Sequence, residues 1–145
     1  MTTIVSWLIR YGHVLSAAVW VGGYALLAFF IIPLLGKEPN ETLMRLAITT
    51  IRVLTYTGTL TMGFGLVLIT RTNGFANLFG SAWGSLIITG FVIAIALLGI
   101  GDGALRPAII RSSKIGNAPA RRWAIIGFVL TVLTVGVMTG ATFVG

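Results

Sequence analysis

The chain has 145 residues, of which 57% are hydrophobic and only 9% are charged, and its mean hydropathy is +1.01. Such a composition excludes an ordinary water-soluble domain, so we expect lipid to be the solvent. The absence of cysteine excludes disulfides, thiolate metal sites and iron–sulfur clusters. The net charge of +7 does not indicate nucleic-acid binding, because the basic residues lie at the ends of apolar stretches.

Four apolar stretches are long enough to cross a bilayer, since a spanning helix needs roughly 20 mostly apolar residues. We expect spans over about 6–35, 46–70, 82–104 and 123–144, in one domain that covers 1–145. The first stretch is too long for a cleaved signal and lacks its basic flank, so we interpret it as a spanning helix. The predicted fold class is all-α: an integral membrane bundle of four helices.

The connections between these spans have distinct compositions. Polar residues over 37–41 form the first turn, and the second helix is amphipathic over 41–52 before it becomes fully apolar. Trp83 marks the start of the third helix. Pro107 follows its expected end, and the segment 111–122 is predicted to be the last loop.

Lysine and arginine are distributed unequally between the two ends of the predicted spans. Eight are in or beside the first and third loops, namely Lys37, Arg45, Arg52, Arg106, Arg111, Lys114, Arg121 and Arg122. Only Arg10 and Arg71 lie on the opposite side. Because positive loops stay in the cytoplasm, both termini are predicted to be extracytoplasmic, in a multi-pass protein of the cell membrane.

Small residues recur at four-residue spacing on three helices, which is typical of close helix contacts in lipid. The pairs are Ala18 with Gly22, Gly99 with Gly103, and Gly136 with Gly140. On the second helix, Gly58, Gly63 and Gly65 have two interpretations. They pack against a neighbouring helix, or they let a flat ligand approach the backbone.

His13 is the only histidine, and it lies within the first predicted span. An ionisable group at that depth is a functional candidate by default. Arg10, one turn earlier, and Trp20, two turns later, share its helix face. The alternative is that His13 only hydrogen-bonds a nearby carbonyl group or lipid headgroup.

A bare metal ion is a poor match for this chain, because copper and zinc sites take several histidine, cysteine, methionine or carboxylate ligands. Haem needs only one or two axial ligands from the protein. We therefore predict that His13 is the metal ligand of a haem b, near the outer leaflet. Met62 or Met138 could supply the second axial ligand, and a vacant position or a ligand from another subunit are the alternatives.

The haem propionates would pair with the two arginines of the outer side, Arg10 and Arg71. Trp20 completes the set of candidate cofactor-binding residues. Asp102 is the one acidic residue within a span, and a buried carboxylate needs a partner, so Arg52 or Arg106 is expected to pair with it. The hydroxyls of the second helix, on Tyr56, Thr57, Thr59 and Thr61, could bond to their own helix or a neighbour, or line a haem or quinone pocket.

The spacing of His13, Trp20 and Gly22-Gly23, in the segment GHVLSAAVWVGG, resembles the first helix of the copper-resistance D (CopD-like) membrane family. That resemblance implies copper handling across the membrane. His13, Trp20, Gly23 and Pro33 also resemble the first helix of HemJ-type protoporphyrinogen oxidases, which implies a role of the histidine in haem binding. The arginine expected after that proline is Leu34 here.

The sequence thus predicts a small membrane-embedded haem b protein with a redox, electron-transfer or sensing role. Two alternatives stay open: a non-catalytic accessory subunit of a larger membrane complex, and CopD-like copper transport. The expected partners are the lipid bilayer and either further copies of the chain or other membrane subunits. Whether the protein catalyses a reaction is left open, since no nucleophile and base form a hydrolytic pattern.

Overall fold

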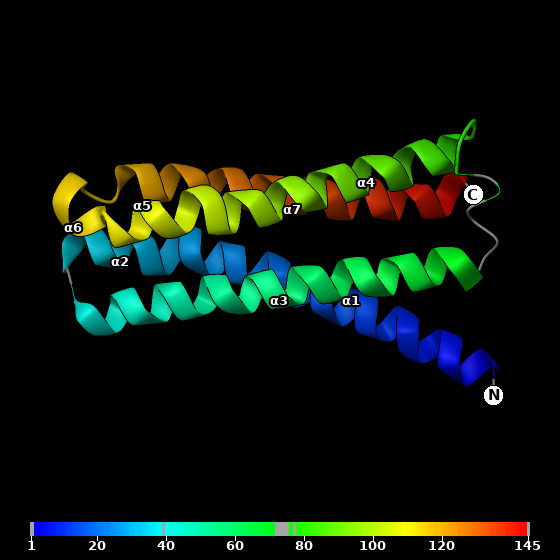
Figure 1. Cartoon of the computed structure of the whole chain (residues 1–145), viewed down its shortest axis with the longest axis horizontal. Helices are drawn as coiled ribbons and strands as arrows, with labels where there is room; N and C mark the ends of the chain where they lie inside the picture. The colour runs from blue at the N-terminus through cyan, green and yellow to red at the C-terminus, as the bar shows by residue number, and fades with distance from the viewer. Residues whose placement is uncertain (1, 39, 72–75, 77, 145) are drawn as a thin grey trace.

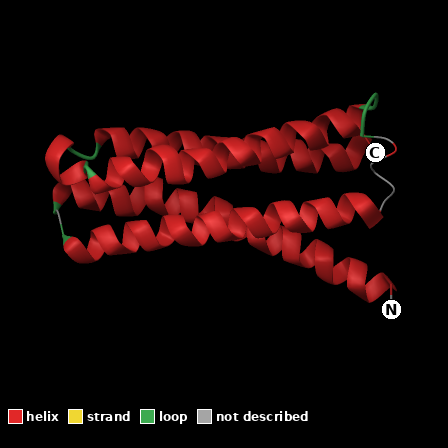
Figure 2. Ribbon diagram, in the orientation of Figure 1, coloured by secondary structure: helices red, strands yellow, loops and turns green. Residues whose placement is uncertain are grey.

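The computed structural model describes residues 2–38, 40–71, 76 and 78–144, without the side chains of Thr2 and Arg71. Its long elements are helical (Figure 2). In order they are α1 (Thr2–Leu26), the π-helix η1 (Leu27–Ile31), α2 (Ile32–Lys37), α3 (Glu41–Arg71), α4 (Ala82–Gly99), the π-helix η3 (Ile100–Leu105), α5 (Arg106–Ile110), α6 (Ser112–Ile115) and α7 (Ala118–Val144).

These elements form four rods that are long and apolar enough to cross a membrane, over Thr3–Lys37, Glu41–Thr70, Ala82–Ile110 and Ala118–Val144. The predicted four-helix membrane bundle is confirmed at this level. The N-terminal end of α1 and the C-terminal end of α7 lie at the same end of the bundle (Figure 1). We call this the terminal end, and the opposite end, where α2, α5 and α6 lie, the basic end.

Two of the helix starts are fixed by side-chain caps. Asn40 precedes α3, and its Oδ1 accepts a hydrogen bond from the Thr42 amide at 2.8 Å. Ser81 precedes α4, and its Oγ accepts one from the Gly84 amide at 3.0 Å. Each cap satisfies an amide that has no partner in the first turn of a helix.

The third rod is longer than predicted, because it continues through Pro107 to Ile110 instead of ending near residue 104. A proline inside a helix lacks an amide donor and collides with the preceding turn. The π-helix η3 widens that turn: the Arg106 amide bonds to the Gly101 carbonyl, five residues back. The same arrangement precedes Pro33, where the Ile32 amide bonds to Leu27.

The fourth rod begins five residues before the predicted start at residue 123, because α7 starts at Ala118. Pro119 lies in its first turn, where an amide donor would have no helical partner anyway. The predicted last loop is therefore shorter, and it contains the short helix α6. Asn117 ties it to the first rod, since its Nδ2 donates to the Ile32 carbonyl at 3.0 Å.

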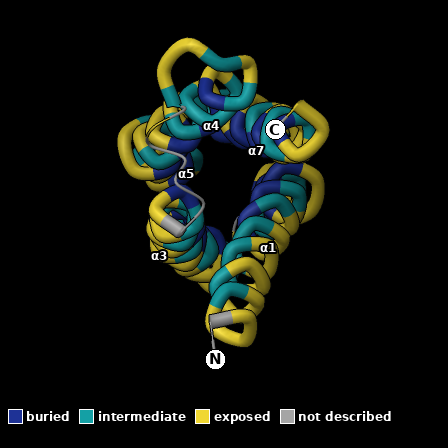
Figure 3. The backbone as a smooth tube through the Cα atoms, turned by 90° about the vertical axis from the view of Figure 1, so that its right-hand side faces the viewer, coloured by how far each residue is buried: buried dark blue, intermediate teal, exposed yellow. Residues whose placement is uncertain are grey.

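The fully buried core lies mainly in the half of the bundle next to the basic end. It includes Leu27, Ile32, Ile51, Leu105 and Ile109. In the other half α1 diverges from α4 and α7 (Figure 1), and Figure 3 shows its first turns as mostly exposed. In lipid such apolar exposure is ordinary, so packing rather than hydrophobicity sets where the helices meet.

Tyr24 is the central residue of that core and is 1% exposed. Its ring lies where a Cβ on Gly127 of α7 would stand, and its hydroxyl donates to the Leu97 carbonyl of α4 at 3.1 Å. One side chain of α1 thereby joins two other rods. Nearby, Phe29 and Phe128 meet edge to face, with ring centroids 5.1 Å apart.

The predicted contacts through four-residue pairs of small residues are wrong for most positions. A Cβ added at Gly22, Gly99, Gly103 or Gly136 would meet nothing within 4 Å, and one at Gly140 would only just reach Leu86. These residues face outward, so they are not used between the rods of one chain. Other glycines do pack between rods: Gly58 and Gly127 each face an aromatic side chain of another rod, whereas Gly23 faces Leu54.

We predict that Tyr24→Phe lowers the free energy of unfolding by about 0.6 to 1.7 kcal/mol, the usual worth of a hydrogen bond between membrane helices. Tyr56→Phe is the matched control, because Tyr56 is 66% exposed. It should change stability by less than about 0.5 kcal/mol. Reversible unfolding in detergent measures both. Equal effects of the two substitutions would contradict the joining role of the Tyr24 hydroxyl.

Candidate functional site

His13 points from α1 toward α3 rather than toward the headgroups. Its Nδ1 lies 2.8 Å from the carbonyl oxygen of Thr61. A carbonyl oxygen only accepts hydrogen bonds, so Nδ1 must carry the proton and donate. In the neutral ring the lone pair is then on Nε2, and no described residue forms a hydrogen bond with that nitrogen.

The imidazole can approach α3 this closely because residue 65 is glycine. A Cβ at Gly65 would lie 3.3 Å from His13 Cε1 and 3.7 Å from the tip of Phe91, which belongs to α4. Gly12 does the same for the neighbouring Phe64 ring. The histidine therefore lies between α1 and α3, and the tip of the Phe91 ring approaches the same glycine from α4.

Trp20 is part of the core, at 3% exposure, and its ring lies 3.2 Å from the position of a Cβ on Gly58. It is about two helical turns from His13 along α1. The pairing of Trp20 with Gly58 and of His13 with Gly65 follows from the antiparallel course of α1 and α3. Of the glycines with two interpretations, Gly58 packs against a helix, Gly65 accommodates the imidazole, and Gly63 faces open space.

Both candidate methionines lie near the level of His13. Met62 follows Thr61 in α3 and packs against the core. The Met138 methyl group occupies the space of a Cβ on Gly90, and Gly90 precedes Phe91, whose ring tip approaches Gly65. Met138 reaches this level from α7, a different rod from those that hold the imidazole.

Of the two arginines in the terminal half, the structure describes the side chain of Arg10 but not that of Arg71. Arg10 is exposed, one turn before His13, and it lines a shallow hollow of about 440 Å³ with Thr3, Ser6 and Trp7. The Arg71 side chain lies outside the described residues, although its backbone ends α3. The pairing of both arginines with one ligand therefore stays a prediction, and of the two only the Arg10 side chain is described.

The hydroxyl groups of α3 bond to their own helix. Thr55, Thr57, Thr59 and Thr61 each donate to a carbonyl three or four residues earlier, at 2.8 to 3.2 Å. Of the two interpretations of these hydroxyls, the structure favours hydrogen bonds within their own helix over the lining of a pocket. The Thr61 carbonyl, not its hydroxyl, is what contacts the histidine.

Asp102 forms no ion pair with Arg52 or Arg106, so the expected pairing is wrong among the described side chains. The ion pair found in the described residues joins Arg45 and Glu41, at 3.0 Å on the surface of α3. The expectation assumed a buried carboxylate. Asp102 is exposed instead, at the surface of η3.

No group of three or more histidine, cysteine, aspartate or glutamate side chains is close enough to hold a metal ion in the described ranges. The donor set near His13 is one imidazole and two thioethers. That set matches the axial needs of haem, which brings its own four equatorial nitrogens.

The sequence singled out His13 as a candidate but not the Thr61 carbonyl, which bonds to it, nor Phe91, which approaches the same Gly65. Phe91 is one of many phenylalanines in apolar helices, and nothing in its spacing singles it out. The Thr61 carbonyl belongs to the backbone, which carries no residue-specific signal. Gly65 was a usable signal, because a glycine in a spanning helix indicates a close approach by another group.

Comparison of the chain with models of protein families, with curated proteins and with solved structures gave no match. The resemblance to CopD-like and HemJ-type proteins therefore stays a prediction that depends on the first helix.

Proposed function

We propose that this protein binds haem b in the terminal half of the bundle, with His13 Nε2 as an axial ligand. The observation that carries the proposal is the 2.8 Å hydrogen bond from Nδ1 to the Thr61 carbonyl. Histidines that ligate metals usually donate their other ring nitrogen to a carbonyl or carboxylate, which fixes the tautomer and the ring plane. His13 has this support from the Thr61 carbonyl.

The distribution of packing agrees with this location. Few side chains of the terminal half belong to the fully buried core, whereas the basic half is filled by large apolar residues. A flat ligand beside His13 would displace fewer packed atoms than one placed deeper. The tip of the Phe91 ring, which approaches Gly65, adds an aromatic group at the same level.

The propionates of the proposed haem would have cationic partners near the terminal end. Arg10 lies one turn from His13 on the same helix, and a guanidinium group binds a carboxylate through two parallel hydrogen bonds. Arg71, at the end of α3, is the other arginine on the side of the spans where Arg10 lies. When bound, haem would supply a one-electron iron couple or an open coordination position.

Met138 is the better placed of the two candidate second ligands. It comes from α7, so together with His13 it would hold a haem from two different rods. Met62 is on the same rod as the carbonyl that holds His13, and its side chain packs against the core. The proposed ligand pair is therefore His13 and Met138.

A second candidate function is supported by the outward glycines. Gly22, Gly63, Gly99, Gly103 and Gly136 would each meet open space if a Cβ were added. Small residues left uncovered on membrane helices are typical of surfaces that pack against further helices. This observation favours a subunit of a larger assembly, a role compatible with haem binding. Copper transport has no comparable support, because the ligand set is too small.

We further propose that the terminal end is extracytoplasmic. Eight of the ten lysines and arginines are in the half of the chain's rods and loops near the basic end. Such an excess stays on the cytoplasmic side during insertion. In that orientation His13 lies in the outer half of the membrane.

The purified protein in detergent is expected to show a Soret band, which disappears in His13→Ala. Gly65→Val should weaken haem binding by roughly tenfold, or about 1.4 kcal/mol, because the added methyls displace the imidazole. Haem titration followed by absorbance measures both effects.

Gly63→Val is the matched control, since residue 63 is on the same helix and faces open space. It should bind haem like the parent chain. A folded parent protein that stays colourless after haem addition would refute the haem proposal. The same result with a second membrane protein in the preparation would favour the subunit role.

The orientation is testable because the chain contains no cysteine. Thr3→Cys is expected to react with a membrane-impermeant maleimide added to intact cells, whereas Ser113→Cys should react only after the membrane is opened. Both positions are exposed, at opposite ends of the bundle. The reverse labelling pattern would place the basic end outside.

A further inference from the structure

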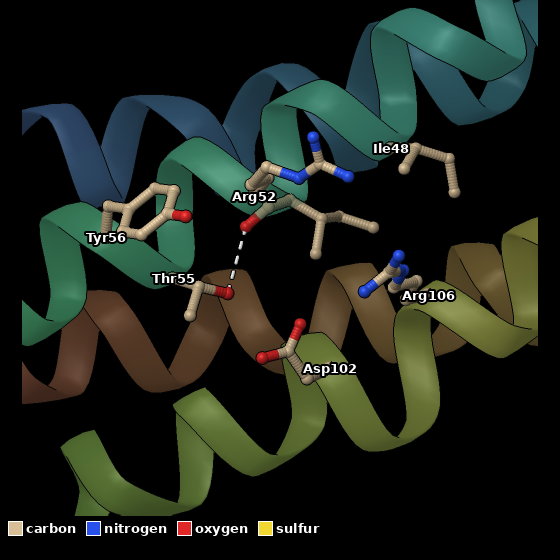
Figure 4. Close-up of a pocket in the computed structure, with 7 residues that line it drawn as sticks. Ile48, Arg52, Thr55, Tyr56, Asp102 and Arg106 are labelled. Atoms are coloured by element: carbon tan, nitrogen blue, oxygen red, sulfur yellow. Dashed lines mark hydrogen bonds between the residues drawn. The ribbon is translucent and has the colours of Figure 1, made fainter.

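A polar groove of about 200 Å³ lies between α3 and the end of the third rod, away from the histidine. Arg52 and Tyr56 enter it from α3, and Asp102 and Arg106 from η3 and α5 (Figure 4). Ile48 and Ile51 form its apolar side. We call it the Arg52–Asp102 groove.

The charges in this groove do not neutralise one another by direct contact. Arg52, Asp102 and Arg106 are all exposed, and no two of them come within 4.0 Å as an ion pair. Two cations and one anion thus share a small hollow on the outer surface of the bundle. A ligand that satisfied all three groups would need both an anionic and a cationic part.

The groove lies near the level of lipid headgroups. The third rod, Ala82–Ile110, has 29 residues and is therefore ~44 Å long, against roughly 30 Å of hydrocarbon. Its ends must reach the headgroup regions. Asp102 is ~12 Å and Arg106 ~6 Å from the end of that rod, so a lipid headgroup and the first part of its chains are within reach.

We propose that the Arg52–Asp102 groove binds one phosphatidylethanolamine molecule. The phosphodiester would accept hydrogen bonds from the guanidinium groups of Arg52 and Arg106, and the primary ammonium would donate to the Asp102 carboxylate. The upper part of an acyl chain would lie on Ile48 and Ile51. Basic pockets between membrane helices are known to bind lipid headgroups in this way.

Asp102 is what distinguishes this headgroup from other phospholipids. An anionic lipid such as phosphatidylglycerol would satisfy the arginines but bring its phosphate close to an unpaired carboxylate. Phosphatidylcholine carries a quaternary ammonium, which has no hydrogen to donate. Neither head satisfies all three charged groups. The site shares no residue with the proposed haem site, so each proposal can fail alone.

Native mass spectrometry of the protein in detergent, with lipids of matched dioleoyl chains, tests the assignment. Phosphatidylethanolamine is expected to bind about fivefold more tightly than either phosphatidylglycerol or phosphatidylcholine. Asp102→Asn should abolish that preference by improving phosphatidylglycerol binding. Arg52→Gln with Arg106→Gln should weaken all three lipids, whereas Arg121→Gln, an exposed arginine on α7, should weaken none.

Two results would overturn the proposal. One is an unchanged ratio of phosphatidylethanolamine to phosphatidylglycerol binding in Asp102→Asn. The other is a parent protein that binds phosphatidylglycerol as tightly as phosphatidylethanolamine. Glycerophosphoethanolamine, which lacks acyl chains, should not compete at equal concentration. If it did compete, the ligand would be a soluble headgroup compound and not a lipid.

Discussion

The bundle depends on aromatic rings that lie against the bare backbone of a facing helix. In lipid, apolar surface gains nothing by leaving the solvent, so helices associate where their atoms fit closely. Tyr24 against Gly127, Trp20 against Gly58 and His13 against Gly65 all follow this rule. The first two fill the core near the basic end. The third uses the same geometry for a side chain that can bind a ligand.

The close approach of His13 to α3 also gives this polar side chain a hydrogen-bond partner. An imidazole within a membrane span needs a partner, and the Thr61 carbonyl supplies it at 2.8 Å. This hydrogen bond fixes the tautomer of the neutral ring: Nδ1, which faces α3, carries the proton, and Nε2 keeps its lone pair. If the proposed haem binds at His13, this hydrogen bond would already hold the ring, which would reduce the ordering cost of binding.

The number and approximate course of the helices could be predicted from hydropathy, because each span is a long apolar run. The helix boundaries near prolines could not be predicted. A π-turn accommodates Pro107, and Pro119 lies in the first turn of α7, and composition reveals neither arrangement. The choice of His13 also came from the sequence. Its neighbours did not, because a backbone carbonyl and an ordinary phenylalanine carry no signal. The ion pair predicted for Asp102 was wrong because the prediction assumed a buried side chain. The exposure of a side chain depends on the tertiary arrangement and not on residue type alone.

The nitrogen spectrum of the single imidazole tests this account most directly. With one histidine in the chain, labelling all histidine with ¹⁵N reports on His13 alone. In the haem-free protein the account predicts a protonated Nδ1 and an unprotonated Nε2, the less common tautomer of free imidazole side chains in water. A protonated Nε2 with a bare Nδ1 would contradict it, because the Thr61 carbonyl could not then hold the ring and the ligand-binding nitrogen would be blocked.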